Sequence, residues 1–393
     1  MADLSKKDQL YELIRANPFI SQQDLAAQLR LSRSAVAGHV AGLIRERRLL
    51  GRAYVIPSPR PIACIGAANL DRKLRSLATL AMGTSNPARQ DESFGGVARN
   101  IAENLARLGA PVSLTTAVGN DASGRALLAH AEAAGIDTAG TLHLDNACSG
   151  TYTAVLDDGG EMLLALADMA LYDLITPDFL ANRQPRRPAP ALTVADLNLP
   201  RETLAMLLED SRREVMPLVM VAVSQPKMAR LPEDLRALRL LILNQGELET
   251  RVGARLLTDD DFARACATVR EQGAQDVIVT RGSAGVMFTC AGGVRHLAAP
   301  AAHVVDVTGA GDAFAAAVCW SLFDGGAGGG DDLELACRRG LKLSAMTLGC
   351  EQTVCPWLGA DSLDAVDGDA RDDAHKASTN QGAVHPFNTL YQE

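Results

Sequence analysis

Between residues 61 and 280 of this 393-residue chain, short apolar runs alternate with longer amphipathic stretches. The runs are PIACIG, PVSLTTAVG, LTVADLNL, PLVMVAVS, LRLLILN and QDVIVT. Runs of this length suit strands that are buried on both faces, and such strands pair in parallel when helices connect them. The alternation therefore predicts an α/β fold, a three-layer α/β/α sandwich with a mostly parallel sheet.

Two segments break the alternation and read as antiparallel hairpins. TYTAVLDDGGEMLLAL (151–166) turns at Asp-Asp-Gly-Gly, and VMFTCAGGVRHLAA (286–299) turns at Gly292-Gly293. We expect the first hairpin to project from the main sheet as a small β lid.

The first 56 residues have a different organisation. Apolar spacing predicts helices from residue 8, after the capping box that begins at Ser21, and after Ser32. The following LLGRAYVIP could form the strand of a wing. Helix, turn, helix and wing together resemble the winged helix-turn-helix domains of bacterial regulators, so duplex DNA is the expected partner. The side chains expected to contact DNA are Arg33, Ser34, His39, Arg45, Arg47 and Arg48.

Charge separates this head from the rest of the chain. Residues 1–60 have a net charge of +5, whereas residues 61–393 have a net charge of −14. The proline-rich residues 57–61 (PSPRP) read as a short linker, which leaves residues 62–365 for the α/β domain. A net charge of +5 is modest, so a helical module used for dimerisation, in a homodimer, stays open as the alternative.

The apolar segments, the amino terminus and the cysteines indicate in which compartment the protein works. The longest apolar segment, 313–323, is shorter than the roughly 18 to 20 residues that a membrane helix needs. The amino terminus lacks the apolar core of a signal peptide, and the eight cysteines form no Cys-x-x-Cys pair. We expect a cytoplasmic protein with free thiols, no membrane association and a disordered tail over residues 366–393.

The segment VVDVTGAGDAFAAAV (304–318) carries the strongest chemical signal. A β-branched run ends at a Gly-Ala-Gly turn, and a helix of small residues follows. Unpaired N–H groups at a helix start favour an anion such as a phosphate, and Gly309 and Gly311 allow a close approach. Asp312 could then accept a proton from the attacking group, or it could be only an acidic residue at a helix start.

Other polar groups directly follow predicted strands. They would lie at the carboxyl ends of the strands, where open α/β folds bind ligands. They lie in GAANLD (66–71), NQGE (244–247) and TRGSAG (280–285), and GGVARNIAENLARLG (95–109) opens a helix with two glycines. Each of these motifs alone is weak. In this order they closely resemble the ribokinase family of PfkB-type carbohydrate and nucleoside kinases, over roughly residues 61–360. GTSNP (83–87), GEMLLALADM (160–169) and VADLN (194–198) resemble its pseudouridine kinase branch most closely.

The resemblance implies roles for the phosphoryl-transfer groups. Asp312 would be the general base, and the amides of Gly309, Ala310 and Gly311 would hold the transferred group. The other implied residues are Asn244, Thr280, Gly282 and Gly285 for ATP, Glu247 for Mg²⁺ through water, and Asp306 and Thr308 for a monovalent cation such as K⁺. For Asp306, a carboxylate that merely stabilises a turn is an equal alternative.

The resemblance also implies an acceptor site for the 5′-hydroxyl of pseudouridine, with another nucleoside or a sugar (inosine, adenosine or ribose) as the alternative. Ser85, Asn86 and Asp168 would read the base, although a turn role is open for all three. The positions matching the sugar site are Asn69, Asp71, Gly96 and Asn100, with Asn198 as a further candidate.

One position departs from the family. Relatives often have Asp-Pro where this chain has Val221-Ala222, which removes a carboxylate that supports the metal network. Two hypotheses therefore remain: an active ATP-dependent kinase, and a transcription regulator whose kinase-like body senses a ligand.

Overall fold

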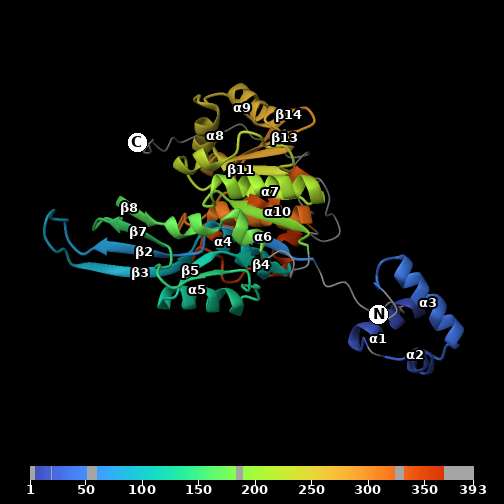
Figure 1. Ribbon diagram of the computed structural model, residues 1–393. Helices are drawn as coiled ribbons and strands as arrows, with labels where there is room; N and C mark the ends of the chain where they lie inside the picture. Colours follow the sequence, from blue (N-terminus) through green and yellow to red (C-terminus); the bar gives the residue numbers. More distant parts are fainter. Residues whose placement is uncertain (1–4, 19, 51–59, 183–188, 324–331, 367–393) are drawn as a thin grey trace. The chain divides into compact units, whose positions relative to one another are not determined.

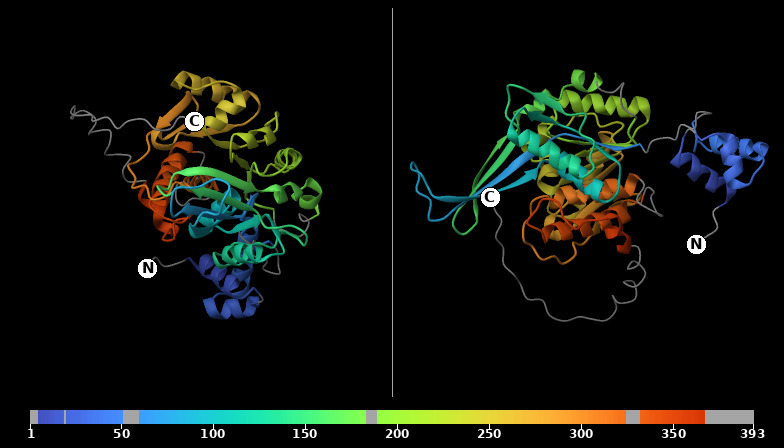
Figure 2. Two further views of the ribbon diagram at one scale, coloured as in Figure 1. Left: turned by 90° about the vertical axis from the view of Figure 1, so that its left-hand side faces the viewer. Right: turned by 90° about the horizontal axis from the view of Figure 1, so that it is seen from below.

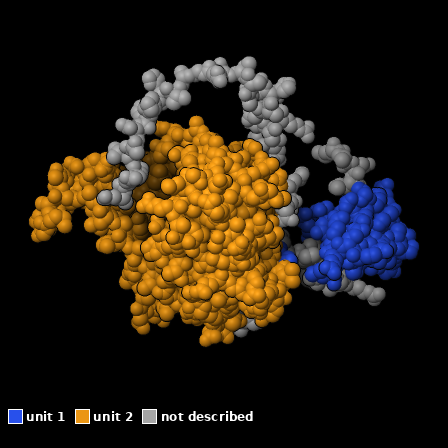
Figure 3. Space-filling model, turned by 90° about the horizontal axis from the view of Figure 1, so that it is seen from above, with its two compact units in different colours: residues 1–60 blue, residues 61–393 orange. Residues whose placement is uncertain are grey.

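The computed structural model describes residues 5–18, 20–50, 60–182, 189–323 and 332–366. The chain forms two compact units, Met1–Arg60 and Pro61–Glu393, which Figure 3 colours separately. The predicted wing beyond residue 50, most of the predicted linker and the predicted tail beyond Val366 lie outside the described residues.

The head is built from three helices, α1 (Lys6–Ala16), α2 (Gln22–Leu29) and α3 (Arg33–Arg45). The hydroxyls of Ser5, Ser21 and Ser32 each accept a hydrogen bond from a backbone N–H in the first turn, which fixes where each helix begins. The helices pack around a small apolar core formed by Leu10, Ile14, Leu25, Val36, Val40, Leu43 and their neighbours. The predicted helix-turn-helix arrangement is therefore present.

An eight-stranded sheet forms the centre of the second unit, in the order β14-β13-β12-β11-β10-β9-β1-β4. All neighbouring pairs from β4 to β12 are parallel, and β13 and β14 extend the sheet as an antiparallel hairpin. The strands are β1 (Ile62–Ile65), β4 (Val112–Thr115), β9 (Leu192–Asp196), β10 (Leu218–Val221), β11 (Leu240–Asn244), β12 (Asp276–Thr280), β13 (Val286–Cys290) and β14 (Gly293–Leu297). The predicted mostly parallel sheet is confirmed.

Helices cover both faces of this sheet, as Figures 1 and 2 show. Alternate strand residues enter two separate apolar cores, which explains why the strands are apolar throughout. One face packs against α4 (Val97–Arg107), α5 (Ala122–Ala133), α10 (Ala310–Phe323) and α11 (Leu333–Leu348). The other face packs against α6 (Pro177–Ala181), α7 (Arg201–Glu214), α8 (Gln245–Val252) and α9 (Asp259–Glu271). In none of the helices among the described residues is an apolar stretch long enough to cross a bilayer.

A second sheet of four strands forms the lid, which projects from the body in Figure 1. Its order is β3-β2-β7-β8, with β2 (Asn69–Ser76), β3 (Ala88–Gly95), β7 (Thr151–Leu156) and β8 (Met162–Asp168). The β7–β8 hairpin confirms the prediction. The β2–β3 hairpin was not predicted, because NLDRKLRS and ARQDESFG lack the apolar alternation that marks a strand.

The remaining elements are short. The run PVSLTTAVG splits into β4 and β5 (Ala117–Gly119), and β5 pairs with β6 (Leu142–Leu144) in a separate two-stranded sheet. Short 3₁₀ helices are η1 (Ala170–Leu174), η3 (Pro226–Arg230), η4 (Gly282–Ala284) and η5 (Ala360–Val366).

Candidate active site

Asp312 lies in the first turn of α10, where the sequence places the general base. The Nδ2 atom of Asn100, on α4, donates a hydrogen bond to its Oδ2 atom at 2.7 Å. Burial raises the pKa of Asp312 to about 7, and the neighbouring carboxylates of Asp196 and Asp71 act in the same direction. A carboxylate with a pKa near neutrality is well matched to accept a proton from an alcohol at physiological pH.

The turn before α10 places backbone N–H groups beside this carboxylate. Gly309 has φ 83°, and a Cβ atom there would lie 2.1 Å from the carbonyl oxygen of Thr353, so this position requires glycine. Around Gly311 a Cβ would meet nothing within 4 Å, which leaves space in front of the turn. The N–H of Ala310 reaches the carbonyl of Val307 only at 3.4 Å. The helix start can therefore accept an anion next to the proton acceptor.

Arg99 fixes the orientation of Asn100, a role that the sequence did not reveal. Its buried guanidinium donates hydrogen bonds to Asn100 Oδ1, to the carbonyl of Phe94 (2.8 Å) and to Glu103 (2.6 Å). Because the amide oxygen of Asn100 faces this cation, its Nδ2 group faces Asp312. The available signal was the spacing of Arg99 and Glu103, an i,i+4 pair of opposite charge on a helix whose buried residues include Ile101 and Leu105.

Two glycines allow the acceptor side of the site to close. Asn69 Nδ2 donates to Asp71 Oδ1 at 2.6 Å, and both side chains are buried. A Cβ on Gly95 would lie 2.1 Å from the Asp71 carboxylate, and one on Gly96 would lie 2.4 Å from the carbonyl of Ala67. Burial raises the pKa of Asp71. The Gly95-Gly96 turn thus lets a carboxylate and amides gather beside α4.

Asp196, at the end of β9, joins three segments of this site. Its Oδ2 accepts hydrogen bonds from the N–H groups of Ala67 (2.9 Å) and Ala98 (3.0 Å), and its Oδ1 from that of Asn198 (2.8 Å). It is completely enclosed, and burial raises its pKa. Asn198 was predicted from VADLN, whereas Asp196 was not, because the role of Asp196 depends on segments distant in the sequence.

The predicted nucleotide residues gather at the ends of two neighbouring strands. Asn244 and Thr280 are directly paired in the register of β11 and β12. Asn244 and Glu247 form a capping box at the start of α8, with distances of 2.9 and 2.7 Å. Gly282 and Gly285 follow with φ 55° and 87°, and a Cβ on Gly285 would lie 2.0 Å from the carbonyl of Leu297. These residues are adjacent, as the sequence order suggested.

Glu247 is the carboxylate expected to support Mg²⁺. It is buried, which raises its pKa, and Oε2 accepts the hydrogen bond from the Asn244 N–H. No cluster of three or more His, Cys, Asp or Glu suited to a metal occurs within the described ranges. One carboxylate is a sufficient protein ligand set for Mg²⁺, which keeps most of its waters and binds substrate phosphates.

Comparison with known proteins identifies the family. Residues 60–358 match the pfkB family of carbohydrate kinases, and residues 5–46 match the winged helix-turn-helix DNA-binding family. The chain belongs to the pfkB family. It is therefore a carbohydrate kinase with an alcohol acceptor, and the helix-turn-helix match agrees with the head described above.

Relatives and solved structures agree with this kinase family. The kinase is 33% identical to the pseudouridine kinase of Escherichia coli (strain K12), over 76% of this chain and 93% of that protein. It is 30% identical to an uncharacterized sugar kinase of the same strain, over 82% and 88% of the two chains. The structure of a carbohydrate kinase from Agrobacterium tumefaciens has a TM-score of 0.67 at 30% identity, covering 78% and 96% of the chains.

A more distant structure supports the fold alone. The Arabidopsis thaliana ribokinase, solved with ribose and ATP, has a TM-score of 0.66 at 20% identity, covering 79% of this kinase and 99% of that chain.

Two of the residues expected to read the base lie far from Asp71. Ser85 and Asn86 are in the loop between β2 and β3, at the far end of the hairpin from Asn69. Asn86 bonds through its side chain to the backbone of Ala81 (2.8 and 2.9 Å) and of Thr84 (3.1 Å). Asn86 therefore organises a turn, which was the alternative interpretation.

Asp168, the third residue expected to read the base, does not share a face of the lid with Asp71. In the lid register, Asp168 pairs with Thr151, and Thr151 pairs with Leu70. Because side chains alternate along a strand, this row lies on the opposite face of the sheet from Asp71.

The two residues expected to bind a monovalent cation, Asp306 and Thr308, both contact the ammonium group of Lys73. Asp306 Oδ1 accepts hydrogen bonds from the N–H (2.9 Å) and the hydroxyl (2.7 Å) of Thr308. Lys73, on β2, donates to Asp306 Oδ2. Burial acts to raise the pKa of Asp306, but the bonds from Lys73 and Thr308 outweigh it and lower the pKa. The carboxylate is anionic and paired, so this arrangement does not fit a free K⁺.

The departure at Val221-Ala222 lies at the carboxyl end of β10, a central strand of the sheet. Val221 is buried at the end of β10, and the N–H of Ala222 donates to the carbonyl of Ile242 at 2.9 Å. The kinase thus keeps the strand ladder there while lacking the carboxylate.

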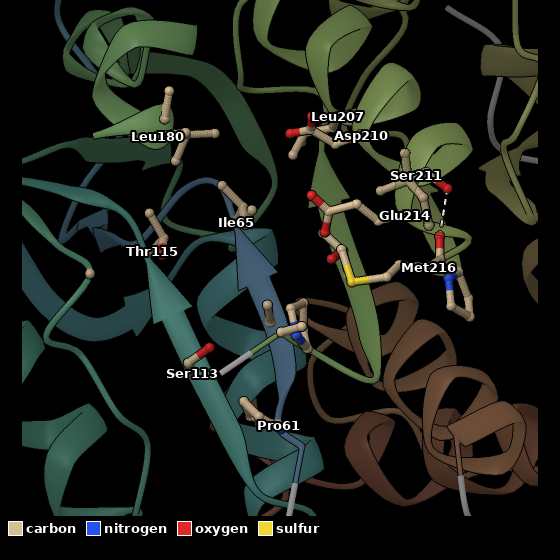
Figure 4. Close-up of a pocket in the computed structure, with 18 of the residues that line it drawn as sticks. Pro61, Ile65, Ser113, Thr115, Leu180, Leu207, Asp210, Ser211, Glu214 and Met216 are labelled. Carbon is tan, nitrogen blue, oxygen red and sulfur yellow. Dashed lines mark hydrogen bonds between the residues drawn. The ribbon is translucent and has the colours of Figure 1, made fainter. Parts of the chain in front are cut away.

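A separate cavity of about 440 Å³ lies over β1, β4 and β9 (Figure 4). Ile65, Ser113 and Thr115 line it from the sheet, and Asp210 and Glu214 line it from α7. None of the predicted site residues is among its lining residues, so this cavity is distinct from the Asp312 site.

In the head, the residues expected to contact DNA divide into two groups. Arg33, Ser34, Arg45 and Arg47 are exposed, and His39 is half-buried. Arg48 instead donates to Asp8 at 2.8 Å and lies over the ring of Tyr11, 4.1 Å from its centroid. Arg48 therefore contributes to the packing of the head.

Proposed function

We propose that this kinase transfers the γ-phosphoryl group of ATP to the 5′-hydroxyl of pseudouridine. The observation that carries the proposal is the pair formed by Asp312 and Asn100 at the start of α10. It combines a carboxylate of nearly neutral pKa with a helix start that can bind an anion. The similarity to the Escherichia coli pseudouridine kinase supports the choice of acceptor.

In the proposed reaction, Asp312 accepts the proton of the 5′-hydroxyl as its oxygen attacks the γ-phosphorus atom. The bond between that phosphorus and the β,γ-bridging oxygen breaks, and ADP leaves with the bond's electron pair. The amides of Gly309, Ala310 and Gly311 stabilise the charge on the transferred group. Asn69, Asp71 and Asn100 hold the ribose, with Gly96 allowing the close approach and Asn198 at its edge.

ATP would lie over the adjacent ends of β11 and β12. We assign Asn244, Thr280, Gly282 and Gly285 to the nucleotide, and Glu247 to Mg²⁺ through bridging water. Mg²⁺ would neutralise charge on the β- and γ-phosphates. The space near Gly282, where a Cβ meets nothing within 4 Å, is compatible with a nucleotide.

Base selection would fall to the face of the lid that carries Asp71. Tyr152 pairs with Asp71 across β2 and β7, so these two side chains share a face. Pseudouracil offers two ring N–H groups, whereas uridine uses one of those positions for its glycosidic bond. An unpaired polar group costs about 1 to 3 kcal/mol, so we expect about 10- to 100-fold preference over uridine.

The test compares kcat/KM for pseudouridine, uridine, inosine, adenosine and ribose, with products identified by mass. Pseudouridine should give the highest value and a product phosphorylated on the 5′ oxygen. A higher value for inosine, adenosine or ribose would reject the acceptor while leaving the kinase assignment intact. Absence of any ATP-dependent product would favour the regulator hypothesis, for which Val221-Ala222 is the supporting observation.

We also propose that the head binds duplex DNA, because residues 5–46 match a DNA-binding family and Arg33 and Arg45 are exposed on α3. Affinity of the full chain for fragments upstream of its own gene should fall steeply with salt. Arg33→Ala and Arg45→Ala should weaken binding and reduce the salt slope, whereas Arg15→Ala on α1 should not. A dimer in sedimentation with no DNA binding would instead support the dimerisation module.

A further inference from the structure

Lys73 is a charged residue of the lid that the proposed reaction does not use. Asn69, Asp71 and Lys73 are alternate residues of β2, so their side chains share one face. The first two form the acceptor side of the site, which places Lys73 one step farther along the same face. Its position on the strand therefore directs it toward the site.

The ammonium group of Lys73 reaches the segment that leads into the TGAGD turn. It donates to Asp306 Oδ2, and it lies 3.4 Å from the hydroxyl of Thr308. Asp91 on β3 is directly opposite Lys73 in the hairpin and is a carboxylate in the same sheet. Lys73 nevertheless pairs with Asp306, and the Asp91 carboxylate contacts Arg89 at 3.4 Å. The lid is thus linked to the body through this ion pair.

The charge on Asp306 matters because of its position. Its Oδ1 atom accepts the N–H of Thr308, the residue directly before Gly309, and so fixes the start of the turn. An uncompensated carboxylate there would repel a phosphoryl group arriving at the amides of Gly309 and Gly311. A monovalent cation on Oδ2 removes this repulsion, and an ammonium is a compact point charge that can supply it.

We propose that Lys73 is a tethered replacement for a free monovalent cation at Asp306 and Thr308, so that this kinase works without K⁺. This inference rests on the proposed phosphotransferase activity. It makes Lys73 a positioning residue: it acts on the phosphoryl site through Asp306. It also ties the charge balance of the turn to the lid strand that carries Asn69 and Asp71.

The experiment measures kcat and thermal unfolding in KCl, NH₄Cl and tetramethylammonium chloride at equal ionic strength. Wild-type activity and Tm should be the same in all three salts to within about twofold and about 1 °C, because no ion binds at Asp306. Lys73→Ala opens space at Oδ2. Its kcat should fall by about tenfold in tetramethylammonium chloride and recover in KCl or NH₄Cl, with a higher Tm in those salts.

Two matched variants complete the test. Lys73→Met removes the charge but keeps most of the side-chain volume, so its activity should stay low in every salt. Arg72→Ala removes a neighbouring cation of β2 that pairs with Glu92 at 2.8 Å on the other face, and it should behave as wild type.

A wild-type enzyme that needs K⁺, or a wild-type Tm that rises in KCl, would overturn the proposal. So would a Lys73→Ala variant that is indifferent to the salt in both measurements. Absence of wild-type turnover with every acceptor in every salt would count against the proposed function. The Tm comparison would still decide whether Lys73 replaces the ion.

Discussion

The start of α10 and the outer part of the lid differ in how firmly their side chains are held. Around Asp312, buried partners from distant segments converge: Asn100 from α4, Arg99 behind it, and Asp196 from β9. In the outer lid, every residue of β8 is exposed, including Met162 and Leu166 with 60% and 66% of their surface accessible.

This difference suggests that the rigid start of α10 serves the phosphoryl transfer, whereas the exposed lid serves substrate recognition. Buried, hydrogen-bonded groups keep one geometry because any alternative leaves a polar atom without a partner, which is costly inside a protein. Exposed strands can exchange protein contacts for water at little cost. We therefore expect large effects from substitutions near Asp312 and small effects from substitutions in the outer lid.

The largest effect should come from Asp312→Asn. This change removes the proton acceptor and leaves the backbone amides in place, so kcat should fall by about 10² to 10⁴-fold while ATP still binds. Rapid-quench kinetics and ATP titration measure the two quantities. Turnover close to wild type would remove Asp312 from the mechanism.

The same variant should be more stable than wild type at pH 8. The folded protein raises the pKa of Asp312 above its unfolded value of about 3.9, so the folded state binds this proton more tightly. The stability that this group contributes is therefore lost as pH rises from about 4 to about 7. Asparagine does not titrate, so Tm of Asp312→Asn should exceed that of wild type at pH 8 but not at pH 4.

Arg99→Met should have the next largest effect. The change removes one of the two arginines that pair with the buried Glu103 and leaves only Arg107, at 2.7 Å. Because a buried carboxylate that loses a partner is costly, the free energy of unfolding should fall by about 3 kcal/mol. The Asn100 amide loses the cation that orients it, and kcat should fall by about 10- to 100-fold.

A pH profile distinguishes positioning by Arg99 from a purely structural role. The positive charge of Arg99 lowers the pKa of Asp312, so the acid limb of Arg99→Met should move to higher pH. Arg107→Met is the matched control: it also removes a partner of Glu103, but it should leave the acid limb where it is. If activity falls at the same acidic pH in both variants, Arg99 only stabilises the fold.

The wild-type pH dependence gives a smaller effect. Asp312 must be deprotonated to accept a proton, so kcat/KM should fall by about tenfold per pH unit below about pH 7 and level off above it. Steady-state kinetics from pH 5.5 to 9 will measure this fall in kcat/KM. A profile that stays flat down to pH 5.5 would mean that another group is the proton acceptor.

Asn86→Ala should have the smallest effect. The side chain joins backbone groups within an exposed loop, so the variant should lose about 1 kcal/mol of stability or less and keep kcat/KM within about twofold. Asn69→Ala, at the other end of the same hairpin, should lower kcat/KM by at least about tenfold. A large rise in KM for the acceptor in Asn86→Ala would show that the loop folds over the base.

The sequence by itself determined the elements whose signals are local. Strands β1 and β9 to β12 followed from apolar runs, and the head helices from serine caps and apolar spacing. The glycines at 95, 96 and 309 marked the turns, and the resemblance supplied the role of Asp312. These signals can be read from the sequence because the residues that define each element lie within a few positions of one another.

Only the tertiary structure decided which side chains meet across long sequence distances. The charged strands β2 and β3 became visible through their pairing, and Asp168 was placed on the opposite face from Asp71 by a register that no local pattern contains. The same holds for Asp196, which bonds to Ala67 and Ala98, and for Lys73, which reaches Asp306. Contacts of this kind depend on how the whole chain closes around its two cores. Burial then raises the pKa of Asp71, Asp196 and Asp312, whereas the bonds from Lys73 and Thr308 lower that of Asp306.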